Sequence, residues 1–361
     1  MDISQIDRRL SSSKIDQAQV EWLNARDKRF SLHGVFYDEK NGRYIRVPDE
    51  VADASRPYLY HLTRMTAGGR LRFVTDSKFI SIKAALIAYS PMPHMSISGS
   101  HGFSVYADSF FRARYSPTFK DFIPFPEDPY SESICFAERK SIAETNEKRV
   151  IEIYFPLYGG VNELFIGVDP GSTIEVAPPY INKKPLVFYG SSITQGACVT
   201  RPGNDYIAIL ARKLNMDYIN LGFSGSGNCE EAMLEYINSI DACLFAYDYN
   251  MYKERKDRVL PPHFSIYERF RKSHPDAAIL LYDKPGCDYE PYPEREEIIR
   301  ATYLKARELG DLRVGYIPAK DLLGESDRDA CMVDCSHPSD LGAMRMADAL
   351  YPIVKKILNS N

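Results

Sequence analysis

The sequence predicts an all-β domain of the sandwich or jelly-roll type, followed by an α/β domain with a parallel sheet between two layers of helices. Residues 32–176 hold short runs of alternating polar and apolar residues separated by turns, which is typical of antiparallel sandwiches. Beyond them, apolar runs alternate with helical patterns, as in repeated β-α units. A length of 361 residues also favours two domains. We place the boundary at the Pro-Pro pair, which divides the chain into residues 1–178 and 179–361.

Alternation predicts the strands of the first domain. The residues before them differ, because 20–25 show a weak helical pattern. The predicted strands cover residues 34–37, 44–48, 70–75, 79–84, 102–107, 150–155 and 163–168.

The strands of the second domain are apolar without alternation, which predicts burial on both faces of the sheet. They cover residues 186–189, 218–221, 243–247, 278–282 and 314–317. Helical patterns cover residues 205–214, 230–239, 264–272, 294–309 and 341–358. This order of elements predicts the three-layer α/β/α arrangement.

Composition narrows the class of function. A net charge of -4 without basic blocks gives no support for a nucleic-acid partner. No apolar run reaches the roughly 18–20 residues that span a bilayer, so no membrane partner is expected. The polar amino terminus and seven scattered cysteines predict a cytoplasmic protein with reduced thiols.

Chemically active residue types follow the predicted strands and precede the last helix. The first strand leads into Gly190-Ser191-Ser192, the second into the glycine-rich run 222–227, and the third into Asp248-Tyr249-Asn250. Asp334 and His337 stand before the final helix. Because parallel strands end at one edge of a sheet, we expect these groups to converge. They are the parts of serine acyl transfer: nucleophile, oxyanion donors, base and orienting acid.

The order of these motifs resembles the SGNH hydrolases, also called the GDSL esterase family, whose sheet is flavodoxin-like. Residues 190–194 resemble block I of that family, which makes Ser192 the nucleophile. Asp334 and His337 match the Asp-x-x-His pair of block V. The resemblance implies a catalytic triad of Ser192, His337 and Asp334.

The same resemblance implies an oxyanion hole. Residues 220–225 are similar to block II, whose last glycine, here Gly225, supplies an N–H donor. Asn250 falls where block III places its asparagine, and the Ser192 N–H is the third donor. A cap or loop role remains the alternative for each of these residues.

Two positions depart from the family pattern. The Gly-Asp-Ser of block I is replaced by Gly190-Ser191-Ser192, so a hydroxyl stands where the family has an acid. Block III usually reads Gly-x-Asn-Asp, whereas this chain has Tyr247-Asp248-Tyr249-Asn250.

The β-rich domain before the hydrolase resembles the architecture of two-domain carbohydrate esterases. We therefore expect a serine esterase that removes acyl groups, foremost O-acetyl, from an oligosaccharide or a small-molecule ester. Two alternatives stay open: an acylhydrolase acting on a lipid or thioester, and an inactive carbohydrate-binding relative. No cofactor and no metal are expected, because the C-x3-C-x-H spacing of Cys331, Cys335 and His337 fits no common zinc template. The sugar, the acyl position and the oligomeric state stay open.

Overall fold

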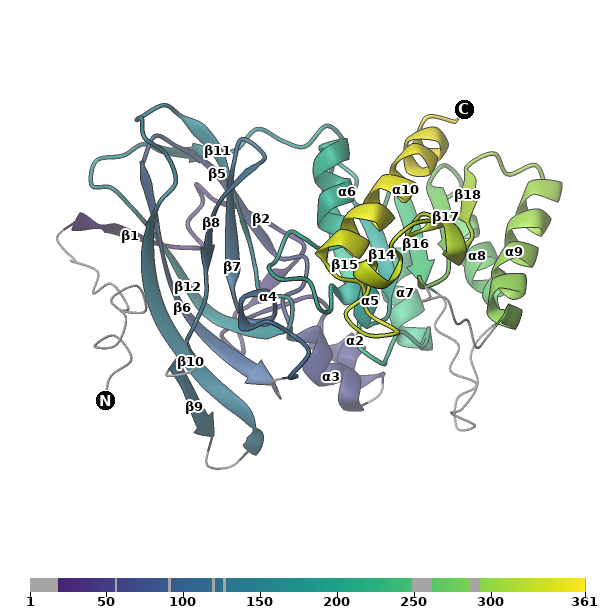
Figure 1. The fold of residues 1–361 in the computed structure, drawn as a ribbon, viewed down its shortest axis with the longest axis horizontal. Helices are drawn as coiled ribbons and strands as arrows, with labels where there is room; N and C mark the ends of the chain where they lie inside the picture. Colours follow the sequence, from purple (N-terminus) through teal and green to yellow (C-terminus); the bar gives the residue numbers. More distant parts are fainter. Residues whose placement is uncertain are drawn as a thin grey trace.

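The structure is a computed structural model that describes residues 19–55, 57–89, 92–118, 121–125, 128–248, 262–285 and 293–360. A β-sandwich and an α/β unit lie side by side (Figure 1). The predicted fold class is confirmed.

Two antiparallel sheets form the sandwich, and alternate residues of their strands fill the core between them, as the pattern predicts. The first sheet has the order β1 (Glu21–Asn24), β12 (Gly159–Val168), β6 (Phe79–Tyr89), β10 (Asp128–Ser141) and β9 (Phe122–Phe125). The second has the order β13 (Ile174–Val176), β5 (Arg70–Thr75), β11 (Arg149–Tyr154), β7 (Phe103–Ala107) and β8 (Phe110–Tyr115), with β2 (Ser31–His33) also paired to β5. A small hairpin joins β3 (Phe36–Asp38) to β4 (Arg43–Ile45).

The helical pattern at residues 20–25 was a wrong prediction. Residues Glu21–Asn24 form β1, which pairs antiparallel with β12 so that Leu23 lies opposite Ile166. Leu23 is buried in the sandwich core. Pairing with a sheet edge and burial of one face outweigh a weak local preference.

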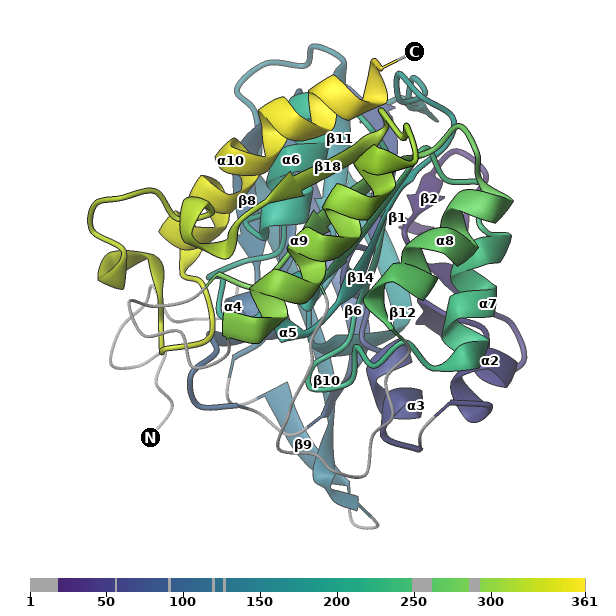
Figure 2. The same ribbon diagram turned by 90° about the vertical axis from the view of Figure 1, so that its right-hand side faces the viewer.

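The second domain has the predicted parallel sheet, in the order β15-β14-β16-β17-β18. Its strands are β14 (Leu186–Gly190), β15 (Tyr218–Gly222), β16 (Leu244–Asp248), β17 (Ala278–Tyr282) and β18 (Val314–Ile317). One face is covered by α6 (Tyr206–Leu214) and α10 (Asp340–Leu358), and the other by α7 (Glu231–Ser239), α8 (His263–Ser273) and α9 (Pro293–Glu308) (Figure 2). Shorter elements are α5 (Ser192–Gln195), η4 (Ala319–Asp321) and η5 (Asp329–Cys331). The order of strands reverses between β14 and β16, because β15 lies on one side of β14 and the later strands lie on the other. Folds of this type bind ligands at the carboxyl ends of the strands beside such a reversal.

In the described part of the first half, three helices were not predicted: α2 (Asp49–Asp53), α3 (Pro57–Thr63) and α4 (Ile97–Ser100). Leu59 and Leu62 of α3 are buried in the core of the α/β unit rather than in the sandwich core. Val47, just before α2, joins them. Hydrophobic packing therefore crosses the 178/179 boundary, which stays a prediction.

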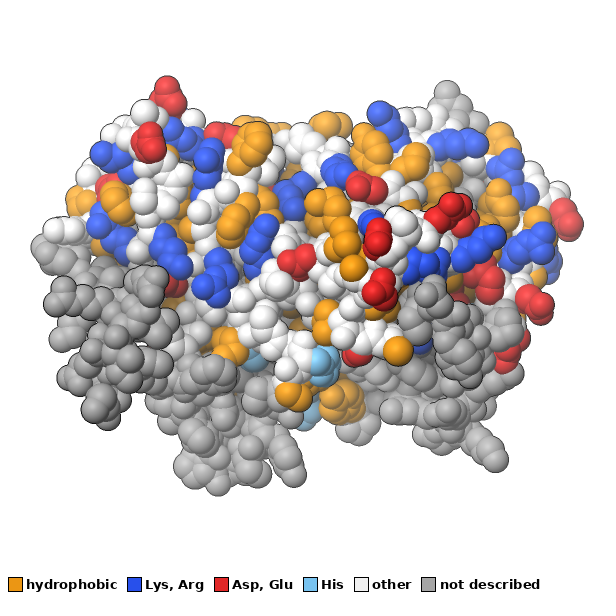
Figure 3. Space-filling view, in the orientation of Figure 1, with side chains coloured by type: hydrophobic (Ala, Val, Ile, Leu, Met, Phe, Trp, Pro, Cys, Tyr) orange, Lys and Arg blue, Asp and Glu red, His pale blue; other side chains and the backbone are white. Residues whose placement is uncertain are grey.

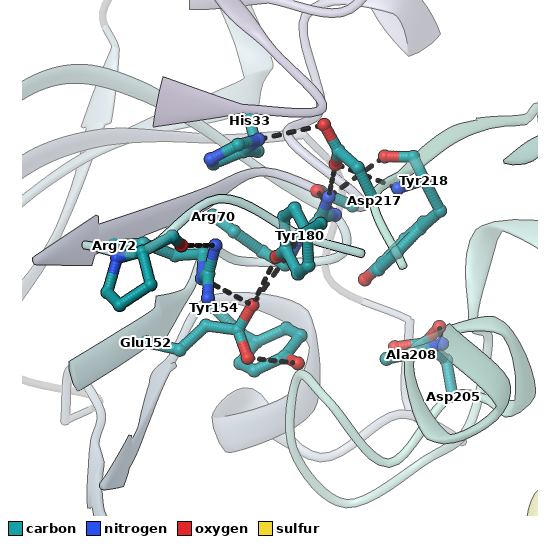
Figure 4. Close-up of polar contacts among 12 residues, drawn as sticks. His33, Arg70, Arg72, Glu152, Tyr154, Tyr180, Asp205, Ala208, Asp217 and Tyr218 are labelled. Carbon is teal, nitrogen blue, oxygen red and sulfur yellow. Dashed lines mark hydrogen bonds and ion pairs between the residues drawn. The ribbon is translucent and has the colours of Figure 1, made fainter. Parts of the chain in front are cut away.

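Polar contacts also join the two halves (Figure 4). Arg70 of β5 is fully buried, pairs with Asp217, and donates to the Tyr218 carbonyl over 3.0 Å. The second oxygen of Asp217 lies 2.8 Å from His33 Nδ1. Glu152 on β11 accepts hydrogen bonds from Tyr180, over 2.6 Å, and from Tyr154. The buried Arg70 charge is thus paired by an acid from the other half, as a charge inside a protein requires.

Acidic and basic side chains are mixed over the face drawn in Figure 3, in keeping with the small net charge of -4. In the part of the chain that the structure describes, no helix has the length and apolar character to cross a membrane.

Candidate active site

The turn after β14 begins at a position that has room only for glycine. A Cβ on Gly190 would lie 2.5 Å from Thr194 Oγ1 and 2.7 Å from Asp248 Cβ. Ser191 then caps α5, because its Oγ accepts a hydrogen bond from the Ile193 N–H. Ser192 is the first residue of α5, so its own N–H has no carbonyl partner within the helix. The turn thus puts the Ser192 hydroxyl at the carboxyl edge of the sheet.

The structure brings Ser192, His337 and Asp334 together. Ser192 Oγ lies 2.9 Å from His337 Nε2. His337 Nδ1 lies 2.9 Å from Asp334 Oδ2 and 3.2 Å from Oδ1. The three side chains therefore form one hydrogen-bonded line. Ser192 is 7% exposed, so it is nearly buried yet not sealed from solvent.

A tight turn fixes Asp334 beneath the histidine ring. Asp334 Oδ1 accepts hydrogen bonds from the backbone N–H groups of Ser336, at 2.7 Å, and His337, at 2.6 Å. Burial by itself would raise the pKa of Asp334. The hydrogen bonds from His337 and the two backbone groups outweigh it and lower that pKa. Asp334 therefore stays ionised where it faces His337.

Ser191, which departs from the pattern of block I, contacts Asp248, which belongs to the run that departs from block III. Ser191 Oγ donates to Asp248 Oδ2 over 2.6 Å, and both side chains are buried. Burial raises the pKa of Asp248, against the opposing effects of the Ser191 hydrogen bond and the positive charge of Arg295. The end of β16 thus places a carboxyl group against the serine that stands where block I has its acid.

The loop after β15 packs on the turn that carries Ser192. Gly222 and Gly227 touch its backbone, since a Cβ on Gly222 would lie 2.1 Å from the Gln195 nitrogen and one on Gly227 2.5 Å from the Gly190 oxygen. Gln195, fully buried, accepts from the Ser224 N–H over 2.9 Å. Gly225 itself has a φ of +64°, and a Cβ there would meet nothing within 4 Å. Position 225 therefore favours glycine because of its left-handed backbone conformation and not because neighbouring atoms would clash with a side chain.

The first half also contributes residues that the sequence did not indicate. Arg46 is 1% exposed, and it donates to the carbonyls of Gly222 over 2.7 Å and of Leu62 over 2.6 Å. Its guanidinium lies over the Phe223 ring at 4.5 Å. Arg46 therefore holds the start of the loop that carries Gly225. In the sequence it stands in a predicted strand, and nothing there signals a buried cation.

His94 is the second such residue. It lies between β6 and α4, and its ring stacks on that of His337 with centroids 5.6 Å apart. His94, Cys198 and His337 offer ligand atoms within 4.8 Å of one another. Among the described residues, these three side chains form the group of His, Cys and acidic residues that is close enough to share a metal ion. Cys331 and Cys335 do not belong to this group.

Asn250, one of the three predicted oxyanion donors, lies outside the described residues.

Comparisons with known proteins agree with this architecture. Residues 183–355 match the GDSL-like lipase/acylhydrolase family, and residues 20–174 match the N-terminus of SGNH-hydrolase-type esterases. No curated protein matches the chain significantly.

Among solved structures, a protein of Bacteroides ovatus described as a GDSL-like lipase is 26% identical with a TM-score of 0.77, and the match covers 94% of this chain and 98% of that one. A salicylyl-acyltransferase from a tetracycline biosynthetic pathway is 17% identical with a TM-score of 0.72, over 93% and 97% of the two chains. A family two carbohydrate esterase from Clostridium thermocellum, in complex with cellohexaose, is 13% identical with a TM-score of 0.55, over 90% and 98%. The last two show a shared fold alone.

The matched regions account for the β-sandwich and for the parallel sheet with its serine turn. The second half of the chain therefore belongs to the GDSL-like lipase/acylhydrolase family, and it follows a β-sandwich that matches the N-terminus of SGNH-hydrolase-type esterases.

Proposed function

We propose that this hydrolase is a serine esterase that removes acyl groups, foremost O-acetyl, from a carbohydrate. The observation that carries the proposal is the line of hydrogen bonds from Ser192 Oγ through His337 to Asp334, at 2.9 Å for each link. A serine, a base and an orienting acid in that order are the parts of acyl transfer through an acyl-enzyme.

In this mechanism His337 takes the proton of Ser192 as Oγ attacks the ester carbonyl. Asp334, kept ionised by its hydrogen bonds, holds Nδ1–H and stabilises the imidazolium that forms. His337 then gives the proton to the departing alcohol, which leaves an acyl group on Ser192. A water that His337 deprotonates hydrolyses this ester and restores the serine.

The oxyanion of the tetrahedral intermediate requires donors at the sheet edge. We assign the N–H groups of Ser192 and Gly225, together with the Asn250 side chain. The Ser192 N–H stands at the start of α5, where a helix favours negative charge. Loss of one oxyanion donor typically costs about 10²–10³ in turnover, so we expect Asn250→Ala to retain residual activity.

The carbohydrate part of the proposal rests on the two-domain relatives. The Clostridium thermocellum protein with the same fold is a carbohydrate esterase that binds cellohexaose. The test is a screen of acetate release over acetylated oligosaccharides. Chromogenic esters of increasing acyl length would separate this substrate class from lipids.

The nucleophile is tested by Ser192→Ala, with Ser336→Ala as a matched serine substitution in the turn that carries His337. We expect Ser192→Ala to lower turnover by about 10⁵–10⁶, as for other serine triads, and to abolish labelling by a fluorophosphonate. Mass spectrometry of the labelled wild type locates the modified residue. Retention of wild-type hydrolysis by Ser192→Ala would reject the mechanism, and a wild-type protein that the probe does not label would favour an inactive relative.

A second outcome of the same chemistry is transfer of the acyl group to an alcohol instead of water. A protein of this fold is a salicylyl-acyltransferase. Product analysis with and without an added sugar acceptor distinguishes the two, because hydrolysis releases the free acid whereas transfer yields a new ester.

A further inference from the structure

Two potential metal ligands from separate loops, His94 and Cys198, lie beside the imidazole of His337. His94 comes from the loop before α4, Cys198 from the loop after α5, and His337 from the turn before α10. One ligand atom of each lies within 4.8 Å of the other two. His94 is exposed while Cys198 is only 9% exposed, so the group is open to solvent on the His94 side.

Contacts to Thr200 hold these three loops together. The Ser98 hydroxyl, four residues after His94, donates to the Thr200 carbonyl over 2.7 Å. The Thr200 N–H donates to Asp340 over 2.8 Å, three residues after His337. Cys198 precedes Thr200 by two residues. Hydrogen bonds to the Thr200 backbone therefore hold together the three loops that carry the ligands.

The donor set selects a class of cation. Two imidazoles and one thiolate suit Zn²⁺ and its neighbours in the transition series, whereas Mg²⁺ and Ca²⁺ prefer oxygen ligands. Ligand atoms around a tetrahedral zinc ion are about 3.3–3.6 Å apart, given bond lengths of about 2.0–2.3 Å. Rotation of the exposed His94 side chain can close the difference. Burial raises the pKa of the Cys198 thiol to about 11, so metal binding would release its proton.

Both ring nitrogens of His337 already have hydrogen-bond partners. Nε2 faces Ser192 at 2.9 Å, and Nδ1 faces Asp334 at 2.9 Å. A metal ion on Nε2 would displace the serine, and one on Nδ1 would displace the carboxylate. We propose that His94, Cys198 and His337 form a binding site for Zn²⁺ or a similar thiophilic divalent cation, whose occupancy switches the enzyme off. Binding depends only on the three ligands, whereas inhibition rests on the proposed function.

Binding is measured with Co²⁺, which gives visible and near-ultraviolet absorption when a thiolate joins nitrogen ligands in a tetrahedral site. Titration of the full-length wild-type protein is expected to give a 1:1 complex with a thiolate charge-transfer band, which Zn²⁺ then displaces. Cys198→Ser should lose that band, and His94→Asn should weaken binding at least about tenfold. Cys135→Ser, which removes an exposed thiol of β10, is the matched control and should titrate like the wild type. Absence of a thiolate band in the wild type, or its persistence in Cys198→Ser, would overturn the site.

Inhibition is measured separately, by hydrolysis of a chromogenic acetyl ester. We expect saturating Zn²⁺ to lower turnover at least about tenfold, because the triad loses one of its links, and Mg²⁺ to have no effect. Each variant is compared with its own metal-free rate. The His94 side chain is exposed, so we expect the His94→Asn variant to fold normally. This variant should require at least about tenfold more Zn²⁺ for half-inhibition.

The two readouts separate the two proposals. Co²⁺ binding by a protein that hydrolyses no ester would support the site and reject the esterase. Ester hydrolysis that Zn²⁺ leaves unchanged or increases would reject the switch while the esterase stands.

Discussion

Ser191 stands where the family pattern has an acid, and its hydroxyl makes two contacts from the turn after β14. Its hydroxyl accepts from the Ile193 N–H and donates to Asp248, so one side chain caps α5 and fastens it to β16. The sequence marked Ser191 and the run from Tyr247 to Asn250 as two separate departures. In the structure Ser191 is hydrogen-bonded to Asp248 of that run.

This pairing predicts a non-additive stability effect. Ser191→Ala removes the helix cap and leaves a buried carboxylate without its hydroxyl partner, so the free energy of unfolding should fall by about 1–3 kcal/mol. Asp248→Leu keeps the volume and removes the acceptor. The double variant should be more stable than the sum of the two single losses predicts, by about 0.5–3 kcal/mol. Urea denaturation of the four proteins measures this coupling, and strictly additive losses would contradict it.

At the scale of elements, the loop after β15 depends on close approach of backbones. Gly222 touches the backbone of Gln195, whereas Gly225 has free space around its Cα and a left-handed φ. The two glycines therefore serve different needs, although both belong to one glycine-rich motif.

The contrast between these glycines is testable with the same substitution at two positions. Gly222→Ala would press a methyl group onto the Gln195 backbone, so we expect a loss of about 3 kcal/mol or more in unfolding free energy, with a fall in turnover. Gly225→Ala requires an alanine to adopt a left-handed backbone conformation, which should lower the unfolding free energy by about 1–2 kcal/mol. The N–H of residue 225 is kept. We expect this variant to retain most activity. Equal losses in denaturation and turnover assays would refute this assignment.

At the scale of the molecule, the two halves share a core. Val47, Leu59 and Leu62 are buried among residues of the α/β unit. Arg46 and Arg70 carry buried charges from the first half to carbonyls and an acid of the second. Burial of apolar surface and pairing of these charges together hold the halves in one arrangement.

We therefore expect residues 179–361 expressed alone to aggregate and to hydrolyse no acetyl ester, because an apolar face would be exposed. The control is the full chain with a protease site introduced at Ile181, which is exposed, between β13 and β14. After cleavage its two pieces should co-elute in size-exclusion chromatography and retain activity. A soluble fragment with full activity would show that the sandwich is dispensable.

Two buried histidines predict how stability depends on pH. Burial lowers the pKa of His101 in the first half to about 4, and that of His263 on α8 to about 3. In the unfolded chain each titrates near about 6.5. Between these values each of the two histidines binds more protons in the unfolded state, so their contribution to stability falls as pH drops from about 6.5 toward about 4.

The slope from each histidine is at most about 1.4 kcal/mol per pH unit. His263→Gln, which keeps a hydrogen-bonding group near Thr302, should remove its share of that slope. Urea denaturation between about pH 4 and pH 7 measures the difference against the wild type. Parallel stability curves for the two proteins would contradict the assignment.

The sequence alone determined the order of the elements and the residue types at the strand ends. All five strands of the parallel sheet lie where unalternating apolar runs predicted them, because burial on both faces leaves a strong local pattern. Ser192, His337 and Asp334 were predicted from short motifs, and their side chains meet. Such motifs are readable because each follows a strand or precedes a helix whose position the pattern already gives.

Only the tertiary structure decided which residues far apart in the sequence come into contact. Glu21–Asn24 became a strand because an edge of β12 was free to pair with it. Arg46 and His94 reached the site from the first half, the one buried beneath the loop of Gly225 and the other stacked on His337. No local pattern encodes such contacts, since burial of a charge and approach of separate loops depend on how the two halves pack. The sequence alone predicted which serine would stand beside His337, while the surroundings of Ser192 required the folded chain.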